Sequence, residues 1–145
     1  MYNRLKELKG VFALFENESH LSNFNTILDR FNRDLSKDVY WTSFIYVIAS
    51  DDDLVRNVNT IIDFKDTAVK AETMFKQNYL TGTTKRLLML AYSLFTDNSK
   101  LELEDETLEF SIPNIFDYLD SQNFEICFNA IKIRYNKQSV DLSSI

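Results

Sequence analysis

The chain has 145 residues, of which 45% are hydrophobic and 26% are charged, and its formal net charge is −6. This length and composition are typical of one globular domain and exclude an intrinsically disordered chain. Two glycines, one proline and 20 aromatic residues leave few positions for tight turns, which favours helices over a fold with many strands. We therefore predict a single all-α domain over residues 1–145, a compact bundle of about seven or eight helices.

Cysteine content and hydropathy exclude several classes of protein. The single cysteine cannot form an internal disulfide, and it cannot belong to a zinc site built from several cysteines. Residues 1–9 are charged and contain no long apolar run, which is not the pattern of a signal peptide. No apolar stretch reaches the roughly 20 residues that a bilayer span requires. We therefore expect a cytoplasmic protein that makes no contact with membranes.

The first part of the chain shows apolar residues at helical spacing. A stripe of Leu and Phe residues, three and four positions apart, predicts a peripheral helix over residues 1–15. Ser19 is expected to cap a second helix. Ser36 or Asp38 is expected to cap a third helix, which is apolar nearly all round and should therefore lie at the centre of the core.

The middle of the chain predicts three more helices. Asp51 is followed by two further aspartates, which favour the positive end of a helix that continues over residues 52–62. A less regular helix is expected over residues 66–78. Thr81 or Thr83 should cap a strongly apolar helix that reaches residue 95.

The last third of the chain changes its pattern. Residues 101–110 alternate between apolar and acidic side chains, which predicts a short strand or extended loop, although no pairing partner is visible. A short helix with proline in its first turn is expected over residues 111–119. Asp120 or Ser121 should cap a final helix over residues 124–135, and residues 136–145 are predicted to form a polar tail. We expect this final helix to bury Phe124, Cys127, Phe128 and Ile131.

No set of residues has the spacing of a known catalytic or metal site. His20 is the only histidine and has no catalytic partner at local spacing, so we interpret it as a surface or capping residue of a helix. Cys127 lies on an apolar helix face, where a thiol is core filler rather than a nucleophile. The three aspartates from Asp51 lack the alternate spacing and the glycine of a metal loop. We expect no metal, no cofactor and no enzymatic activity.

A possible anion site follows Gly82. Thr83, Lys85 and Arg86 place a hydroxyl and two cations at a helix start, where backbone N–H groups can bind an anion. A nucleotide-binding loop is excluded because it needs a preceding strand and an earlier glycine. The alternative interpretation is ordinary helix initiation with flanking charges.

The acidic side chains are concentrated in one segment. Residues 97–125 contain nine Asp or Glu residues and one lysine. The densest part can be a solvated loop, or an acidic face that binds the basic groove of a nucleic-acid-binding host protein. Direct nucleic-acid binding is not expected, because Lys132, Arg134 and Lys137 form too small a basic patch. Tyr2, Tyr79 and Tyr92 are candidate exposed anchors for an interface. The candidate partner-binding residues are Glu102, Glu104, Asp105, Glu106 and Glu109.

A further set of segments, taken in chain order, comprises residues 19–24, 46–49, 87–95 and 115–120, Phe124 and residues 130–134. Together and in this order they resemble a family of small uncharacterised helical proteins from low-GC Gram-positive bacteria and their phages. The resemblance implies a compact α fold and a mobile-element origin, and it supplies no known activity or catalytic residue. The chain departs from the pattern in its helix before Glu16 and in its acidic stretch.

These features lead to three hypotheses. The first is a non-enzymatic protein-interaction module that acts through its acidic surface, in one form an anti-CRISPR-like phage inhibitor of a bacterial defence nuclease. The second is a structural or regulatory homo-oligomer, a dimer formed through residues 5–15. The third is an enzyme whose site combines dispersed carboxylates such as Asp51, Asp63 and Glu72.

Overall fold

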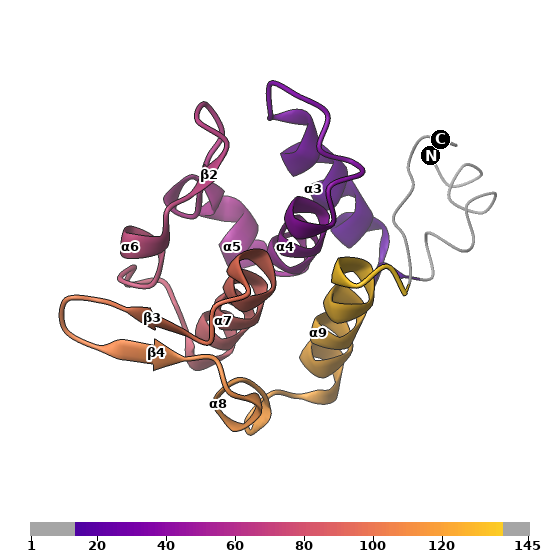
Figure 1. Ribbon diagram of the computed structural model, residues 1–145. Coiled ribbons are helices and arrows are strands. Elements are labelled where there is room, and N and C mark those ends of the chain that lie inside the picture. The colour runs from indigo at the N-terminus through magenta and orange to yellow at the C-terminus, as the bar shows by residue number, and fades with distance from the viewer. Residues whose placement is uncertain (1–13, 138–145) are drawn as a thin grey trace.

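The computed structural model describes residues 14–137 of the chain, and in this range the fold is mainly helical, as predicted (Figure 1). It contains seven α-helices, one short 3-10 helix and two small antiparallel sheets of two strands each. Most of the predicted helix over residues 1–15 lies outside the described residues. The proposed dimer contact through residues 5–15 and most of the predicted tail over residues 136–145 lie outside them too.

The most apolar segment of the chain forms the central helix, α4 (Val39–Ala49). Each residue from Trp41 to Ala49 is buried, because α4 contacts α3 (Glu18–Asp29), α7 (Gly82–Thr96) and α9 (Ser121–Arg134) on different sides (Figure 1). Full burial of one large apolar side chain contributes about 1.5–3 kcal/mol, so this helix contributes strongly to the stability of the core. The prediction of a central third helix is confirmed.

Side-chain caps fix the beginnings of the helices. The Asp38 carboxylate accepts hydrogen bonds from the first N–H groups of α4, and Asp51 does the same for α5 (Asp52–Arg56), as predicted. Thr81 and Thr84 form a reciprocal capping box at the start of α7. The prediction of Ser19 as the cap of α3 is wrong, because the Asn17 side chain accepts the hydrogen bond from the His20 N–H.

The two helices predicted over residues 52–62 and 66–78 are largely replaced by short elements. Helix α5 ends at Arg56, and the 3-10 helix η1 (Val58–Thr60) follows; strands β1 (Ile62–Asp63) and β2 (Ala68–Val69) then pair antiparallel before α6 (Ala71–Met74). Two polar side chains explain the breaks. Asn57 donates to the Asp53 carbonyl and Asp63 accepts from the Asp66 N–H, so both compete with helical backbone bonds.

The alternating segment after α7 forms a β-hairpin with itself. Strand β3 (Lys100–Glu102) pairs with β4 (Thr107–Glu109), and Leu101 lies opposite Leu108. The predicted strand is confirmed, and its partner, which was not visible in the sequence, is a second strand of the same segment. The partner is hidden in the sequence because the connecting residues contain no glycine or Asn-Gly pair that would mark a hairpin turn.

Two helices complete the described chain. Ser111 caps the short helix α8 (Ile112–Phe116), whose first turn contains the proline, and Asp120 caps α9, as predicted. Helix α9 buries Ile126, Cys127, Ala130 and Ile133 against the rest of the core. The expectation that Phe124 and Phe128 are buried is wrong, since both side chains are about half exposed.

Candidate functional site

The acidic stretch is displayed on the hairpin formed by β3 and β4. Strand alternation turns Leu101, Leu103 and Leu108 toward the core, so the carboxylates between them point away from it. The hairpin extends from the body of the fold beside α7 and α8 (Figure 1). All five predicted partner-binding residues are exposed there: Glu102, Glu104, Asp105, Glu106 and Glu109. We call this surface the acidic hairpin.

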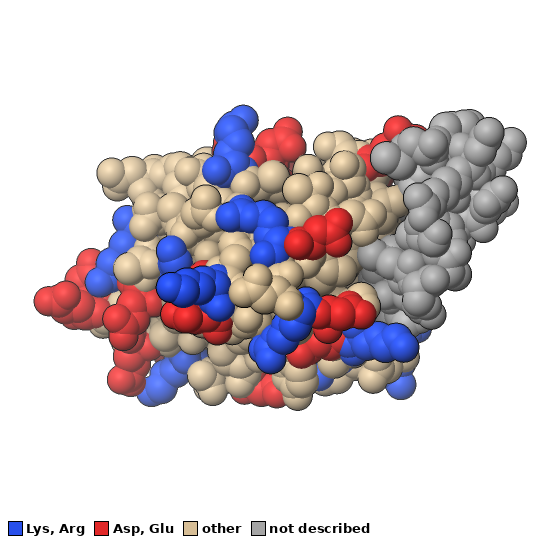
Figure 2. Space-filling model, turned by 90° about the horizontal axis from the view of Figure 1, so that it is seen from above, with Lys and Arg blue, Asp and Glu red and all other residues tan. Residues whose placement is uncertain are grey.

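Basic side chains neutralise only part of the acidic hairpin. Lys85 Nζ lies 3.4 Å from Glu106 Oε1, and Lys100 Nζ lies 3.3 Å from Glu102 Oε1. Both pairs are solvent-exposed, and such pairs contribute at most about 1 kcal/mol. Among residues 14–137, no ion pair forms at Glu104, Asp105 or Glu109. Figure 2 shows red carboxylates gathered at the end of the molecule where the hairpin projects.

The cations of the possible anion site have separate neighbours. The Lys85 ammonium group points to Glu106, and the Arg86 guanidinium lies 5.1 Å from the centre of the Tyr118 ring. At the same helix start, the Thr84 N–H already donates to the Thr81 hydroxyl. Thr83 is partly buried beside them. The structure therefore does not gather these side chains around one common point.

Exposed apolar side chains adjoin the acidic hairpin on α8 and the turn that follows it. Ile112 is 75% exposed and Tyr118 is 79% exposed. The Asn114 side chain donates to the Glu109 carbonyl (3.0 Å), which fixes α8 to the end of β4. Acidic and apolar groups are thus neighbours on one rigid part of the surface.

Of the three tyrosines expected as interface anchors, Tyr2 lies outside the described residues and the other two are buried or partly buried. Tyr92 is buried against Phe75 and Phe110, so its expected exposure is wrong. Tyr79 is partly buried, and its hydroxyl shares a hydrogen bond with Thr60 (2.9 Å). The exposed tyrosines of the described chain are Tyr40, Tyr118 and Tyr135.

His20 is a buried structural residue and not the surface residue that the sequence predicted. Only 2% of its surface is exposed. Its Nδ1 accepts a hydrogen bond from the Glu16 N–H (3.1 Å), so the proton resides on Nε2, which donates to the Tyr46 carbonyl (2.8 Å). Burial lowers the pKa of His20 to about 4, against the opposing effect of the hydrogen bond to Tyr46. No local pattern could reveal this, because Tyr46 is 26 residues away.

The contacts of His20 belong to a larger buried polar network. The Tyr46 hydroxyl donates to the Leu14 carbonyl and accepts from Asn129 Nδ2 (3.2 Å). Asn129 also donates to the Leu14 carbonyl (3.4 Å). Because these residues come from the start of the described chain, α4 and α9, the network holds three distant segments together.

Cys127 fits the sequence-based interpretation of an inert core thiol. It is fully buried on α9, and burial raises its pKa to about 12. A thiol with this pKa carries almost no thiolate at neutral pH, so it is a poor nucleophile.

A polar pocket of about 560 Å³ opens where the N-terminal ends of α3 and α5 meet the C-terminal end of α4. Its lining includes Glu16, three aspartates starting at Asp51, and Arg56, which pairs with Asp53. Burial, together with the nearby carboxylates of Asp120 and Asp52, raises the pKa of Glu16. Among residues 14–137, no group of three or more His, Cys, Asp or Glu side chains is arranged to hold a metal ion.

The dispersed carboxylates proposed for an enzyme site do not share this pocket. Asp51 caps α5 and lines the pocket. Asp63 instead accepts the Asp66 N–H within the turn between β1 and β2, and Glu72 is exposed on α6. Neither of the latter two belongs to the pocket lining.

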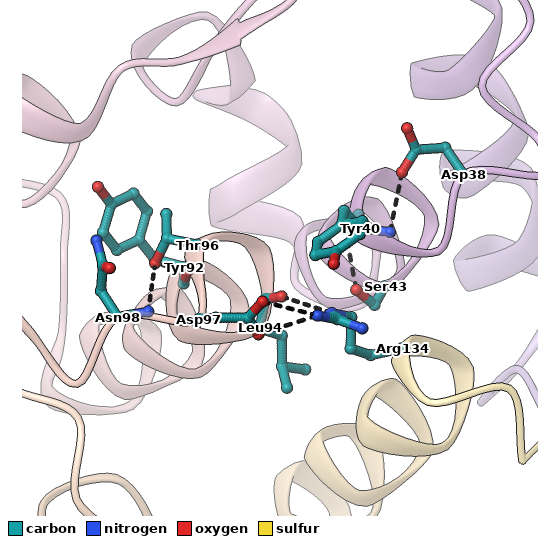
Figure 3. A network of polar contacts seen from close by, with 9 residues as sticks. All are labelled: Asp38, Tyr40, Ser43, Tyr92, Leu94, Thr96, Asp97, Asn98 and Arg134. Carbon is teal, nitrogen blue, oxygen red and sulfur yellow. Dashed lines mark hydrogen bonds and ion pairs between the residues drawn. The ribbon is translucent and has the colours of Figure 1, made fainter.

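Arg134 of α9 links this helix to the end of α7 through several polar contacts (Figure 3). Its Nε donates to the Leu94 carbonyl (2.9 Å), and one Nη donates to both oxygens of Asp97 (2.9 Å each). Its guanidinium also lies 3.8 Å from the centre of the Tyr40 ring. Asp97 occupies the left-handed conformation that ends α7. Arg134 therefore closes the end of α7 from α9, and this use of the side chain removes it from any basic surface patch.

Comparisons with known proteins identify a family and nothing more specific. No helix among the described residues has the length and apolar character needed to cross a membrane. No curated protein and no solved structure matches the chain. The model of a family of unknown function, DUF6075, matches residues 12–144. Since this match covers nearly all of the sequence, the chain belongs to the DUF6075 family.

Proposed function

We propose that the chain is a non-enzymatic protein-interaction module that binds a basic partner protein through the acidic hairpin. The observation that carries this proposal is the display of five exposed carboxylates on one projecting hairpin, three of which form no ion pair within residues 14–137. Uncompensated charges of one sign create a field that attracts opposite charge and accelerates association.

The exposed apolar groups beside the hairpin supply binding affinity, which charged contacts alone do not provide. Charged contacts at the rim of an interface mainly steer and orient, whereas buried aromatic anchors give most of the affinity. Tyr118 and Ile112 are largely exposed on α8 and the turn after it, and the Asn114 hydrogen bond to the Glu109 carbonyl holds α8 to the end of the hairpin. A partner that covers both groups would combine Lys or Arg side chains with an apolar pocket.

A nucleic-acid-binding protein is the class of partner that best fits this surface. Its groove carries Lys and Arg side chains arranged for phosphates, and carboxylates can compete for the same cations. In its specific form, the proposal is a phage or mobile-element protein from low-GC Gram-positive bacteria that inhibits a bacterial defence nuclease in the cytoplasm. Such an inhibitor would displace nucleic acid from the nuclease.

The experiment compares two variants of equal charge. In the first, the five carboxylates of the acidic hairpin are changed to the corresponding amides, which brings the net charge from −6 to about −1. In the control, five exposed carboxylates elsewhere are changed in the same way: Glu18, Asp29, Asp34, Asp66 and Glu72. Each protein is immobilised and exposed to bacterial lysate, and a retained protein is then purified for binding measurements.

We expect the wild type and the control to retain the same basic protein, and the hairpin variant to lose it. Affinity for the purified partner should fall as salt rises, since exposed charge pairs are screened. With a purified defence nuclease as partner, the wild-type chain should release its bound DNA. Equal retention by the two variants would show that the acidic hairpin is not the binding surface.

A further inference from the structure

Helix α9 has two apolar faces, of which one is buried in the core and the other remains partly exposed. One face packs against α4 and α7 through Ile126, Ala130 and Ile133. The other bears aromatic side chains that remain about half exposed: Phe124 (48%), Phe128 (46%) and Tyr135 (52%). At 100° per residue these three side chains and the partly buried Ile131 fall within one narrow stripe. A surface helix normally carries polar residues at such positions.

The fold holds this stripe rigidly at both ends. Phe124 packs edge-on against Phe116 of α8, with ring centres 5.3 Å apart. Tyr135 lies beside the Arg134 guanidinium (4.9 Å), which in turn lies against Tyr40. These contacts restrict the aromatic side chains at both ends of the stripe, so these side chains would lose little conformational entropy when a partner covers them.

The arrangement of the stripe is self-complementary. If a second copy of α9 packs antiparallel with its centre between Asn129 and Ala130, Phe124 meets Tyr135 of the second copy and Phe128 meets Ile131. Each contact then occurs twice, as a two-fold axis requires. A parallel pair would instead place each residue of the stripe against the same residue of the second copy, for example Phe124 against Phe124. It would therefore not form the Phe124–Tyr135 and Phe128–Ile131 contacts.

The charges beside the stripe favour the same pairing. Glu125 and Lys132 lie on one flank of α9, seven residues apart, and neither forms an ion pair within residues 14–137. In the antiparallel pair, Glu125 of one copy lies close to Lys132 of the other. They are offset by two residues, about 3 Å along the axis at 1.5 Å per residue, which a lysine side chain can span. Two reciprocal ion pairs therefore form along this flank.

We infer that two copies of this chain associate through the exposed stripe of α9, packed antiparallel. Three half-exposed aromatic side chains offer roughly 300 Å² per copy, and the flanking residues bring the total near the lower limit of about 1,000 Å² for specific interfaces. The dimer is thus a reversible one that forms at micromolar or higher concentrations. It uses a different surface from the acidic hairpin.

The test measures oligomeric state with the full chain by sedimentation equilibrium, from about 5 to about 500 μM at about 150 mM salt. The wild type should show a reversible monomer–dimer equilibrium. Phe128→Ser should weaken the dimer at least about tenfold, because the loss occurs in both copies. The matched control is Ile112→Ser, which removes another exposed apolar side chain away from α9 and should leave the equilibrium unchanged.

Charge reversal tests the antiparallel orientation. Glu125→Lys and Lys132→Glu should each weaken self-association, since each places like charges together twice. An equimolar mixture of the two variants should restore it as a heterodimer, because every pair then joins Glu with Lys. The charge-change control is Glu102→Lys on the acidic hairpin, which should have no effect. Thermal unfolding of each variant verifies that it is folded.

Three results would overturn the inference. The first is a wild-type chain that stays monomeric over the whole concentration range. The second is a dimer that persists in Phe128→Ser. If that dimer is lost in Leu8→Ser, the contact lies in residues 5–15 and not on α9. The third is a mixture of the charge-reversed variants that associates no better than either variant alone, which would exclude the antiparallel pairing.

Discussion

The buried histidine makes the stability of this protein depend on pH in a specific way. His20 is neutral in the folded state, where burial holds its pKa near 4, whereas an unfolded chain gives histidine its ordinary pKa of about 6.5. Below pH 6.5 the unfolded state therefore binds a proton that the folded state does not bind. The free energy of unfolding falls as pH decreases from about 6.5 to about 4, and this contribution vanishes above pH 7.

The size of the effect follows from the two pKa values. A difference of about 2.5 pKa units corresponds to about 3.4 kcal/mol once the pH is below both values. Between pH 7 and pH 5 the loss amounts to about 2 kcal/mol, which is a large part of the stability of a typical domain. The main structural origin of this loss is burial of the ring, which would desolvate an imidazolium; a second proton, on Nδ1, would also face the Glu16 N–H that now donates to that atom.

The perturbation that isolates this effect is His20→Gln, because the amide can still donate to the Tyr46 carbonyl and accept from the Glu16 N–H. Loss of the ring contacts with Phe15 and Tyr46 lowers stability at every pH. Urea unfolding of both proteins from pH 7 to pH 5 should show the wild type losing about 2 kcal/mol more than the variant. Other titrating groups, including Glu16 with its raised pKa, are present in both proteins and cancel in the comparison.

Parallel stability curves for the two proteins would refute this account of His20. A second measurement stands even if the variant fails to fold. The chain contains one histidine, so a single set of imidazole resonances reports its titration in the folded wild type. Those resonances should not shift until the pH falls below about 5. A midpoint near 6.5 in the folded protein would show that His20 is hydrated.

Two further predictions concern the contacts of α9. Arg134→Met should lower the free energy of unfolding by about 2 kcal/mol, because it removes the hydrogen bonds to Leu94 and Asp97 at the end of α7. Arg134→Lys should recover little of this lost stability in urea unfolding, since an ammonium group cannot reproduce the planar arrangement of guanidinium donors. Full recovery by lysine would show that only the positive charge matters. Cys127 should react with an aromatic disulfide reagent only as fast as the protein opens, because its thiol is buried and its pKa is near 12. The urea-unfolded chain, in which Cys127 should be labelled fast, is the control. Equally rapid labelling of the folded protein at pH 8 would show that Cys127 is not buried.

Helices with long apolar stripes and polar caps were predictable from sequence. Residues 39–49 are apolar on nearly every side, so only a central position could bury them, and Asp38 marks their start. The same holds for α7, where Thr81 begins an apolar helix, and for Asp120 at the start of α9. Local rules suffice here because cap and stripe act within a few residues of one another.

Short elements and the candidate surface were harder to predict. The helix expected to continue from Asp51 to residue 62 stops at Arg56, where the Asn57 side chain donates to the Asp53 carbonyl. A helical and a non-helical backbone differ little in free energy at such a position, so the sequence does not show which of them forms. The acidic hairpin was predicted as an exposed acidic segment. Its strand partner was not predicted, because pairing within residues 100–109 depends on how Leu101 and Leu108 together meet the core.

The sequence by itself determined the mainly helical fold, the identity of the central helix, the inert environment of Cys127 and the concentration of acidic charge in one segment. Only the tertiary structure decided that His20 is buried, that Arg134 closes the end of α7, and that Phe124 and Phe128 are exposed. Each of these depends on partners from distant segments, such as Tyr46 for His20 and Asp97 for Arg134. A helix with two apolar faces does not reveal in its sequence which face the rest of the chain will cover.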